Sequence, residues 1–170
     1  MDNISIRQAT LDDLKTIQQL GFELSEYERR SWDKTLDSNW SFSKEGEAAY
    51  IKAISEKISL IVEQDDTPIG YLICKISHPG PNDARHLVTA YLENIYVKPD
   101  FRGSGIGKKL FTELCTRCKK ENVQKIDVMV NSKNIPAIKF YEKMGYSPSR
   151  LMMSCELKDG EEQRGLEQKR

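Results

Sequence analysis

Long apolar runs are absent from this 170-residue sequence, and cysteine and histidine are scarce. No apolar run approaches the roughly 20 residues that cross a bilayer, so no membrane association is expected. The opening residues, MDNISIRQAT, lack the basic and apolar regions of a signal peptide, which favours a cytoplasmic location. A chain of this length can bury a sufficient core as a single domain without disulfides or metals.

The scarce cysteines and histidines exclude two kinds of site. His78 and His86 have no partner at metal-ligand spacing, so no metal is expected. Cys115 and Cys118 form a C-x-x-C pair, but they fall inside an expected helix rather than at its start. We therefore expect packing cysteines in a reducing compartment.

A net charge of zero hides an uneven distribution of charge. Residues 98–145 contain eleven basic and five acidic side chains, whereas residues 1–97 contain ten basic and sixteen acidic ones. Solvated helix faces would account for this pattern. The alternative is a basic half that binds an anionic ligand and an acidic half that binds something cationic.

Hydrophobic periodicity predicts alternating strands and helices along most of the chain. Strands are expected at residues 4–10, at 58–77 as two strands joined by the turn QDDTP, at 87–97, at 125–131 and at 147–158 as a closing strand or pair; helices are expected from Thr10, over about 45–57, over about 105–121 and from Pro136 to Gly145. This order predicts one mixed α/β domain over residues 1–157. Residues 158–170 are expected to be disordered, because residues 159–170 contain a single leucine.

Three glycines at alternate positions lie between an expected strand and an expected helix, in VKPDFRGSGIGKKL. This glycine turn, Gly103 to Gly107, can curl with its N–H groups pointing inward, because residues without Cβ reach conformations that others avoid. Such a turn at the start of a helix is a site for phosphate, to which Arg102 and Lys108 would add charge. The alternative is a flexible connection.

The glycine spacing excludes two familiar phosphate loops. The dinucleotide fingerprint requires G-x-G-x-x-G, and the triphosphate loop requires a glycine five positions before the glycine of a G-K pair that is followed by Ser or Thr. Here the spacing is G-x-G-x-G, position 102 is arginine and position 109 is lysine. Neither loop fits.

Two motifs resemble those of the GCN5-related N-acetyltransferase (GNAT) superfamily. The first is its R-x-x-G-x-G acyl-CoA pyrophosphate loop, matched by Arg102, Gly105 and Gly107. The second is N-x-x-A-x-x-F-Y-x-x-x-G-[FY], matched by Asn134, Ala137, Phe140, Tyr141, Gly145 and Tyr146. The resemblance, from Ile4 to Leu157, implies a GNAT fold with a mixed central sheet of about six to seven strands flanked by about four helices.

The resemblance also implies acetyl-CoA as cosubstrate, with its pyrophosphate in the glycine turn. In the family the preceding strand splays from its neighbour, so backbone groups of Ile95 and Val97 would bond the pantetheine arm as another strand would. The implied coenzyme-binding residues are Ile95, Tyr96, Val97, Arg102, Gly103, Ser104, Gly105, Ile106, Gly107, Lys108, Asn134 and Tyr141.

Acetyl transfer to an amine requires a base and an acid. An alkyl ammonium loses its proton at pH 7 at a cost of roughly 4 to 5 kcal/mol, and the departing thiolate must be stabilised. At the family's tyrosine position, Tyr141 is the expected acid; the alternative is a packing tyrosine. Glu93 is the candidate base, expected on the face of Ile95 and Val97 because it lies two residues before Ile95. The alternative is a solvated or structural glutamate.

Acidic and aromatic residues between positions 23 and 50 suggest where the acceptor binds. Seven acids and four bases are interleaved there with aromatic rings. Tyr27 and Trp32, together with Glu93, would suit a cationic amine through cation–π contact and charge pairing. Two amphipathic helices that use these aromatics as core would explain the pattern equally well.

The expected function is an acetyl-CoA-dependent N-acetyltransferase acting on a small primary amine. YLENIYVKPDFRGSGIG resembles the polyamine-acetylating branch, so a polyamine-like acceptor is expected. Acetylation of a protein N-terminus or lysine is an alternative, and a non-catalytic acyl-CoA-binding module is another. The glycine turn explains the basic cluster more economically than nucleic acid does, so no nucleic-acid partner is expected. A homodimer is expected from its frequency in the superfamily.

Overall fold

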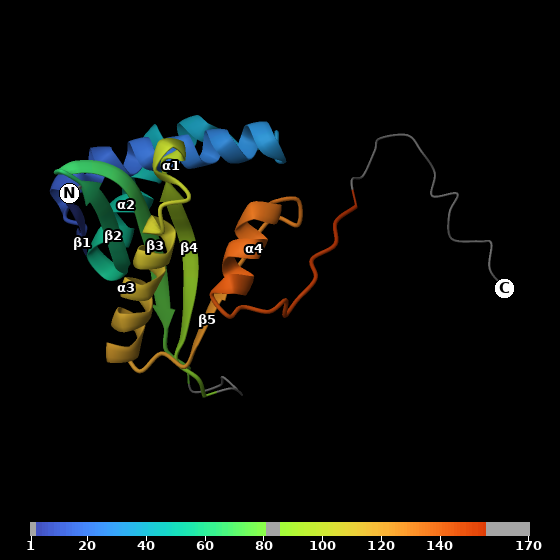
Figure 1. Cartoon of the computed structure of the whole chain (residues 1–170). Coiled ribbons are helices and arrows are strands. Elements are labelled where there is room, and N and C mark those ends of the chain that lie inside the picture. The colour runs from blue at the N-terminus through green and yellow to red at the C-terminus, as the bar shows by residue number, and fades with distance from the viewer. Residues whose placement is uncertain (1–2, 81–85, 156–170) are drawn as a thin grey trace, which may run out of the picture.

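The computed structural model of the chain describes residues 3–80 and 86–155. Within these residues five strands form one sheet in the order β1-β2-β3-β4-β5. The strands are β1 (Ile4–Gln8), β2 (Ile58–Gln64), β3 (Thr67–Ser77), β4 (Thr89–Val97) and β5 (Lys125–Val128). Neighbours from β1 to β4 are antiparallel, whereas β4 and β5 are parallel and are joined through a helix (Figure 1).

Four α-helices cover the two faces of the sheet in the described part of the chain (Figure 1). They are α1 (Leu14–Ser31), α2 (Lys44–Glu56), α3 (Ile106–Lys120) and α4 (Ile135–Lys143). The expected start at Thr10 is confirmed. The Thr10 N–H donates to the Asp13 carboxylate at 2.8 Å in a capping box, and a 3-10 turn, Leu11–Asp13, leads into α1.

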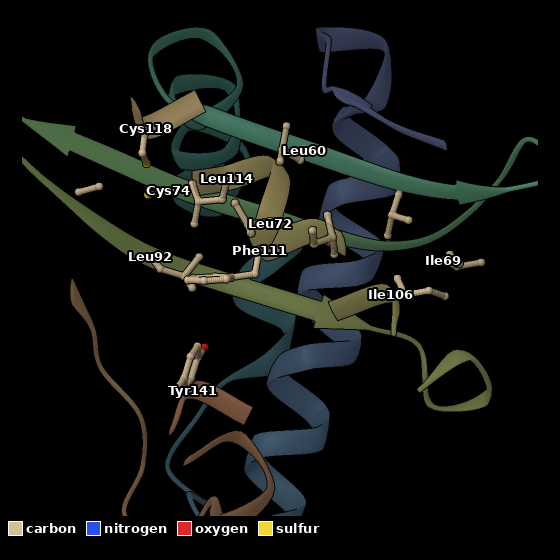
Figure 2. Close-up of a cluster of buried hydrophobic side chains, with 13 residues drawn as sticks. Leu60, Ile69, Leu72, Cys74, Leu92, Ile106, Phe111, Leu114, Cys118 and Tyr141 are labelled. Carbon is tan, nitrogen blue, oxygen red and sulfur yellow. The ribbon is translucent and has the colours of Figure 1, made fainter. Parts of the chain in front are cut away.

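Side chains that alternate along the strands build a core on each face. The α3 core lies under α3 and α4, and the α1 core lies under α1 and α2 (Figure 2 shows the α3 core). The buried members of the α3 core are Leu60, Val62, Ile69, Leu72, Cys74, Ala90, Leu92, Ile106, Leu110, Phe111, Leu114, Cys118 and Tyr141. Those of the α1 core are Ala9, Ile17, Leu20, Tyr50, Ala53, Ile54, Ile61, Tyr71, Ile73 and Tyr96.

The predicted turn between β2 and β3 is confirmed and contains two residues. Asp65 and Asp66 have φ angles of 47° and 62°, and Gln64 pairs with Thr67 across the hairpin. Two successive positive φ angles are the signature of a type I′ turn, whose twist matches that of the strands it joins. This hairpin forms the centre of the antiparallel part of the sheet.

The closing strand expected after position 146 is not formed in residues 147–155, and residues 156–158 lie outside the described part. The sheet formed by the described residues therefore has five strands, whereas six to seven were expected. Leu151, Met152 and Met153 are consecutive, so an extended chain would direct them to both of its sides, and each is more than 80% exposed. Among the described residues, no helix is long and apolar enough to cross a membrane.

Candidate active site

The pairing between the parallel strands β4 and β5 ends halfway along β4. Thr89 to Leu92 pair with Lys125 to Val128, and the described residues show no pairing between these strands beyond that point. On its other side β4 carries a bulge, because Ile73 faces Asn94 and Cys74 faces Leu92, which leaves Glu93 without a partner. An extra residue bends the strand that carries it. From Glu93 onward, β4 therefore runs with one edge open.

Ile95 and Val97 direct their backbone groups to this open edge. Lys98 donates its N–H to the Ile69 carbonyl in the direction of β3, at 2.9 Å. Successive residues of a strand direct their backbone groups to opposite edges, so Val97 and Ile95 point away from β3. We call their N–H and C=O groups the open edge of β4.

The glycine turn leads from the open edge into α3. Gly103 and Gly105 have φ angles of 80° and 86°, which disfavour any side chain. The first helical bond runs from the Lys109 N–H to the Gly105 carbonyl at 3.0 Å. Within the described chain, no N–H from Gly103 to Lys108 donates a hydrogen bond. These donors at the positive end of a helix form a site for a phosphate anion.

Gly107 lies where the first turn of α3 faces α4, the helix that carries Tyr141. A Cβ at this position would lie 3.4 Å from Phe140 Cε2, which is an ordinary van der Waals contact. Packing therefore does not require a glycine at this position.

Arg102 points across the end of β4 rather than into the glycine turn. Its Nε donates to the Val97 carbonyl at 2.8 Å. Its guanidinium carbon lies 4.7 Å from the ring centroid of Tyr27 and 5.4 Å from that of Tyr96. Arg102 thus binds one group of the open edge and connects it to α1 through cation–π contact.

Tyr27 and Trp32 lie together, as an acceptor-binding pair requires. Their ring centroids are 5.3 Å apart in an edge-to-face arrangement at the end of α1. Through Tyr27 the pair contacts Arg102. The structure therefore places these two aromatics beside the glycine turn.

Tyr141 stands on α4 in the α3 core, with its oxygen directed toward the sheet (Figure 2). The side chain is buried, and among the described residues its hydroxyl makes no hydrogen bond. Burial, aided by the negative charge of Glu28, raises the pKa of Tyr141 to about 12. The phenol is therefore a protonated donor throughout the neutral range.

Glu93 does not lie on the face that strict alternation predicts. Ala90 and Leu92 belong to the α3 core, and Ile95 and Val97 pack against that same core. The alternation therefore slips by one residue at Glu93. The expectation that Glu93 shares the face of Ile95 and Val97 is wrong, because the bulge breaks the two-residue period.

A lysine holds the carboxylate of Glu93. Lys57 follows directly after α2, and its Nζ donates to both carboxylate oxygens of Glu93, at 2.9 and 2.6 Å. The two side chains are 17% and 28% exposed, so the pair is partly shielded from water. Among the described residues, Glu93 makes no hydrogen bond or ion pair with Tyr27 or Trp32.

Glu28 is a site residue that the sequence reasoning missed. It is half-buried, and burial, with the nearby charge of Asp33, raises the pKa of its carboxyl group. Its charge acts on both Tyr141 and Tyr71, so it lies on the inner side of α1. Helical spacing from Leu24, four residues earlier, could have indicated this position.

The sequence of the glycine turn and of α4 is part of a wider match. The sequence model of the acetyltransferase (GNAT) family matches residues 18–146. The chain belongs to this family. The resemblance to the GNAT superfamily is thereby confirmed.

Relatives and solved structures of this GNAT chain agree with the assignment. An uncharacterized N-acetyltransferase of Methanocaldococcus jannaschii is 26% identical over 87% of this chain and 62% of its own length. A thialysine N-epsilon-acetyltransferase of Bos taurus is 28% identical over 84% of this chain and 83% of its own. The chain spans 44% to 62% of the length of the first curated relatives it matches.

Solved structures match the whole described fold. A Bacillus halodurans protein, BH1408, has a TM-score of 0.80 at 21% identity, covering 90% of this chain and 99% of that one. An aminoglycoside N-acetyltransferase in complex with CoA has a TM-score of 0.68 at 18% identity, covering 92% of this chain and 96% of that one. At these identities the likeness shows the fold, which confirms the expected GNAT architecture.

Two of the coenzyme-binding residues expected in this GNAT chain use their side chains to hold the backbone. Asn134 caps α4, since its Oδ1 accepts the Ala137 N–H at 3.1 Å. Ser104 Oγ donates to the Phe101 carbonyl at 2.7 Å. In the described chain, the side-chain N–H groups of Asn134 and the backbone N–H of Ser104 donate no hydrogen bond.

A shallow depression of about 420 Å³ adjoins the glycine turn. It is lined by Ile6, Gly105, Lys108, Lys109, Thr112 and Glu113. Its two lysines favour an anionic ligand. In residues 3–80 and 86–155, no group of three or more His, Cys, Asp or Glu side chains could hold a metal.

Proposed function

We propose that this GNAT chain transfers an acetyl group from acetyl-CoA to a small primary amine, by direct attack within a ternary complex. The observation that carries the proposal is the continuity of the open edge of β4 with the glycine turn. An extended ligand with an anionic end fits both, because among the described residues one part offers strand groups that no neighbouring strand pairs with and the other offers helix N–H groups that donate no hydrogen bond.

The coenzyme would bind along this path from the turn toward the bulge. The N–H groups from Gly103 to Lys108 would hold the pyrophosphate, and the open edge of β4 would bond the pantetheine amides. From Val97 back to Glu93 an extended strand covers roughly 13 Å, so the thioester end would lie near the bulge. Arg102 must give up the Val97 carbonyl if the coenzyme takes it, and its guanidinium then becomes available to the pyrophosphate.

Tyr141 would donate a hydrogen bond to the departing thiolate. With a pKa of about 12 against roughly 8.5 for a thiol, complete proton transfer would be uphill by roughly 5 kcal/mol. Hydrogen bonding lowers the barrier without that cost, and in the buried site it is stronger than in water. Glu93 is proposed as the base, acting directly or through water.

The acceptor would enter from the side of α1. Tyr27, Trp32 and the unpaired carboxylate of Glu28 offer a cationic amine aromatic faces and a negative charge. The name of the bovine relative, a thialysine N-epsilon-acetyltransferase, supports a small amine. A polyamine is the finer proposal, which rests on the strand glutamate at its spacing before Arg102.

Protein acetylation is the second candidate. A relative in Salmonella typhimurium is named a peptidyl-lysine N-acetyltransferase, and it is 25% identical over 68% of this chain. A peptide would need a groove open at both ends, whereas Glu28 and the aromatic pair favour a compact cation.

A screen of acceptors distinguishes these proposals. Spermidine, thialysine, lysine and a lysine-containing peptide would each be incubated with acetyl-CoA while free thiol is measured. We expect thiol release with the small amines and little release with the peptide. With Tyr141→Phe, release should be much slower for every acceptor. Binding of acetyl-CoA without release for any acceptor would favour the non-catalytic alternative.

A further inference from the structure

An amine of the protein itself lies beside the residue at which the thioester is expected to end. Lys57 Nζ lies 2.6 Å and 2.9 Å from the two carboxylate oxygens of Glu93. Glu93 is the bulge residue, next to the last paired position of β4 and β5. An acceptor ammonium that gives its proton directly to Glu93 must occupy this same position.

We propose that Lys57 is an internal acetyl acceptor, which the chain modifies by using its own coenzyme site. The inference rests on the proposed function, because acetyl-CoA must lie along the open edge of β4 for its thioester to reach the bulge. The side chain of Lys57 is 17% exposed, so its position is restricted before any coenzyme binds. Such pre-positioning makes the reaction intramolecular once the coenzyme has bound.

The chemical step is an ordinary aminolysis. The Lys57 ammonium gives one proton to Glu93, and the neutral Nζ attacks the thioester carbonyl carbon. The C–S bond breaks, a C–N bond forms, and the thiolate leaves with a hydrogen bond from Tyr141. The nitrogen loses a second proton, which the thiolate takes up to become the thiol, and Glu93 returns its own proton to water. The products are one amide, one thiol and one proton, and no further reactant is needed.

The modification would also change the site. An acetylated Lys57 has no positive charge, so it no longer forms an ion pair with the carboxylate of Glu93. An external cationic amine would then meet a free carboxylate. Self-acetylation would thus free the carboxylate of Glu93 from its ion pair with Lys57, so that it could act as the base for an external amine.

Lys52 is a matched control within the same region. It lies on α2, five residues before Lys57, and its side chain is 67% exposed with a loose ion pair of 3.8 Å to Glu56. Chemical acetylation by the thioester in solution favours exposed amines, so it would label Lys52 before Lys57. Enzymatic self-acetylation would reverse this order.

The experiment is a time course of the full chain with isotope-labelled acetyl-CoA and no added amine, read by intact mass and peptide mapping. We expect one acetyl group on Lys57, formed about tenfold or more faster than on Lys52, at a first-order rate independent of protein concentration. Lys57→Arg should abolish it and Lys52→Arg should not. Gly105→Glu, with an anion in the phosphate site, should slow it about tenfold or more.

Several outcomes would overturn the proposal. These are an unmodified Lys57, equal labelling of Lys52, an unchanged rate in Gly105→Glu, or a rate that rises with protein concentration. Lys57→Gln and circular dichroism check that loss of labelling is not loss of the fold. If added amines cause thiol release but Lys57 is not acetylated, the proposed function stands and only the internal acceptor is disproved.

Discussion

At the scale of single residues, the site depends on where two ionisable groups are held. Tyr141 is buried among apolar neighbours, which favour its neutral form, whereas Glu93 is held by a lysine. In the proposed reaction Tyr141 would donate a hydrogen bond and Glu93 would accept a proton.

Tyr141→Phe should lower kcat about 100-fold with little change in acetyl-CoA affinity, because only the bond to the departing thiolate is lost. The raised pKa, about 12, keeps the phenol protonated as pH rises to about 10. The ratio of wild-type to variant kcat should therefore stay constant from pH 7 to about 10. Steady-state kinetics over this range measures it, and full activity of the variant would remove Tyr141 as the acid.

Glu93→Gln should remove an acidic limb from the pH profile of kcat/KM, because the amide can neither accept the substrate proton nor titrate. The ion pair with Lys57 is lost as well, so circular dichroism must show an unchanged fold. If the profile of the variant matches that of the wild type, Glu93 has a structural role only.

The sequence could predict Tyr141 but not the surroundings of Glu93. Tyr141 lies in a motif with several fixed positions, and its burial follows from the helix that carries it. Glu93 lies in a bulge, which depends on how β3 and β4 pair and leaves no local signal in the sequence. Lys57 is 36 residues away in the chain, so its contact with Glu93 could only be found in the fold.

At the scale of elements, the end of β4 is held in place by close contact with β3. A Cβ at Gly70 would lie 2.4 Å from the Tyr96 carbonyl oxygen and 3.2 Å from Val97 Cα. Both are backbone atoms, so a larger residue would push the two strands apart next to the open edge. The position of the open edge thus depends on a glycine in the neighbouring strand.

Gly70→Ala should therefore lower the free energy of unfolding by about 1 to 3 kcal/mol and weaken acetyl-CoA binding. Gly80→Ala is the control, because a Cβ there would meet nothing within 4 Å. Urea denaturation measures both variants. Equal stabilities would show that β3 and β4 can separate freely at this point.

Most elements could be predicted because their signals are local. The cap at Thr10, the turn at Asp65 and Asp66 and the left-handed Gly145, with φ of 90°, all follow from nearby residues. The closing strand expected after position 146 could not be settled in this way, since pairing requires a partner elsewhere in the sheet. The apolar residues 151–153 are consecutive, so they lack the alternation of polar and apolar residues that is typical of a strand with one buried face.

At the scale of the whole molecule, one ionic network joins the first strand to its neighbours. Arg7 donates to Asp13 at 2.8 Å and to Glu63 at 2.7 Å, which ties β1 to the start of α1 and to β2. The bond from Arg7 is the main reason that the pKa of Asp13 falls to about 2. A carboxyl group whose pKa is lowered in the folded state stabilises that state above its unfolded pKa.

Asp13→Asn should therefore cost about 1 to 2 kcal/mol at pH 7, after allowance for water screening of Arg7, which is 41% exposed. The difference from the wild type should shrink as pH falls from about 4 to 2, because Asp13 takes up its proton in the unfolded state at a higher pH than in the folded state. Asp12→Asn, in the same turn but exposed, is the control. Urea denaturation across this range measures the difference, and a constant difference would contradict the assignment.

The fold shows where some of the unevenly distributed charges lie. The basic half contains the glycine turn, with Lys108 and Lys109 beside it, and the acidic half contributes α1 with Glu28. Composition alone could not separate this arrangement from ordinary solvated helix faces. The proposed binding of an anionic coenzyme and a cationic amine would account for the asymmetry, which stays a prediction.

Titration of the full chain with acetyl-CoA by calorimetry tests the central claim, that the glycine turn and the open edge of β4 hold the coenzyme. We predict one binding site per chain in the wild type. Gly105→Glu should lose at least about tenfold in affinity, because its carboxylate repels the pyrophosphate and its φ of 86° is unfavourable for a side chain. A folded Gly105→Glu variant that binds acetyl-CoA as tightly as the wild type would contradict the claim.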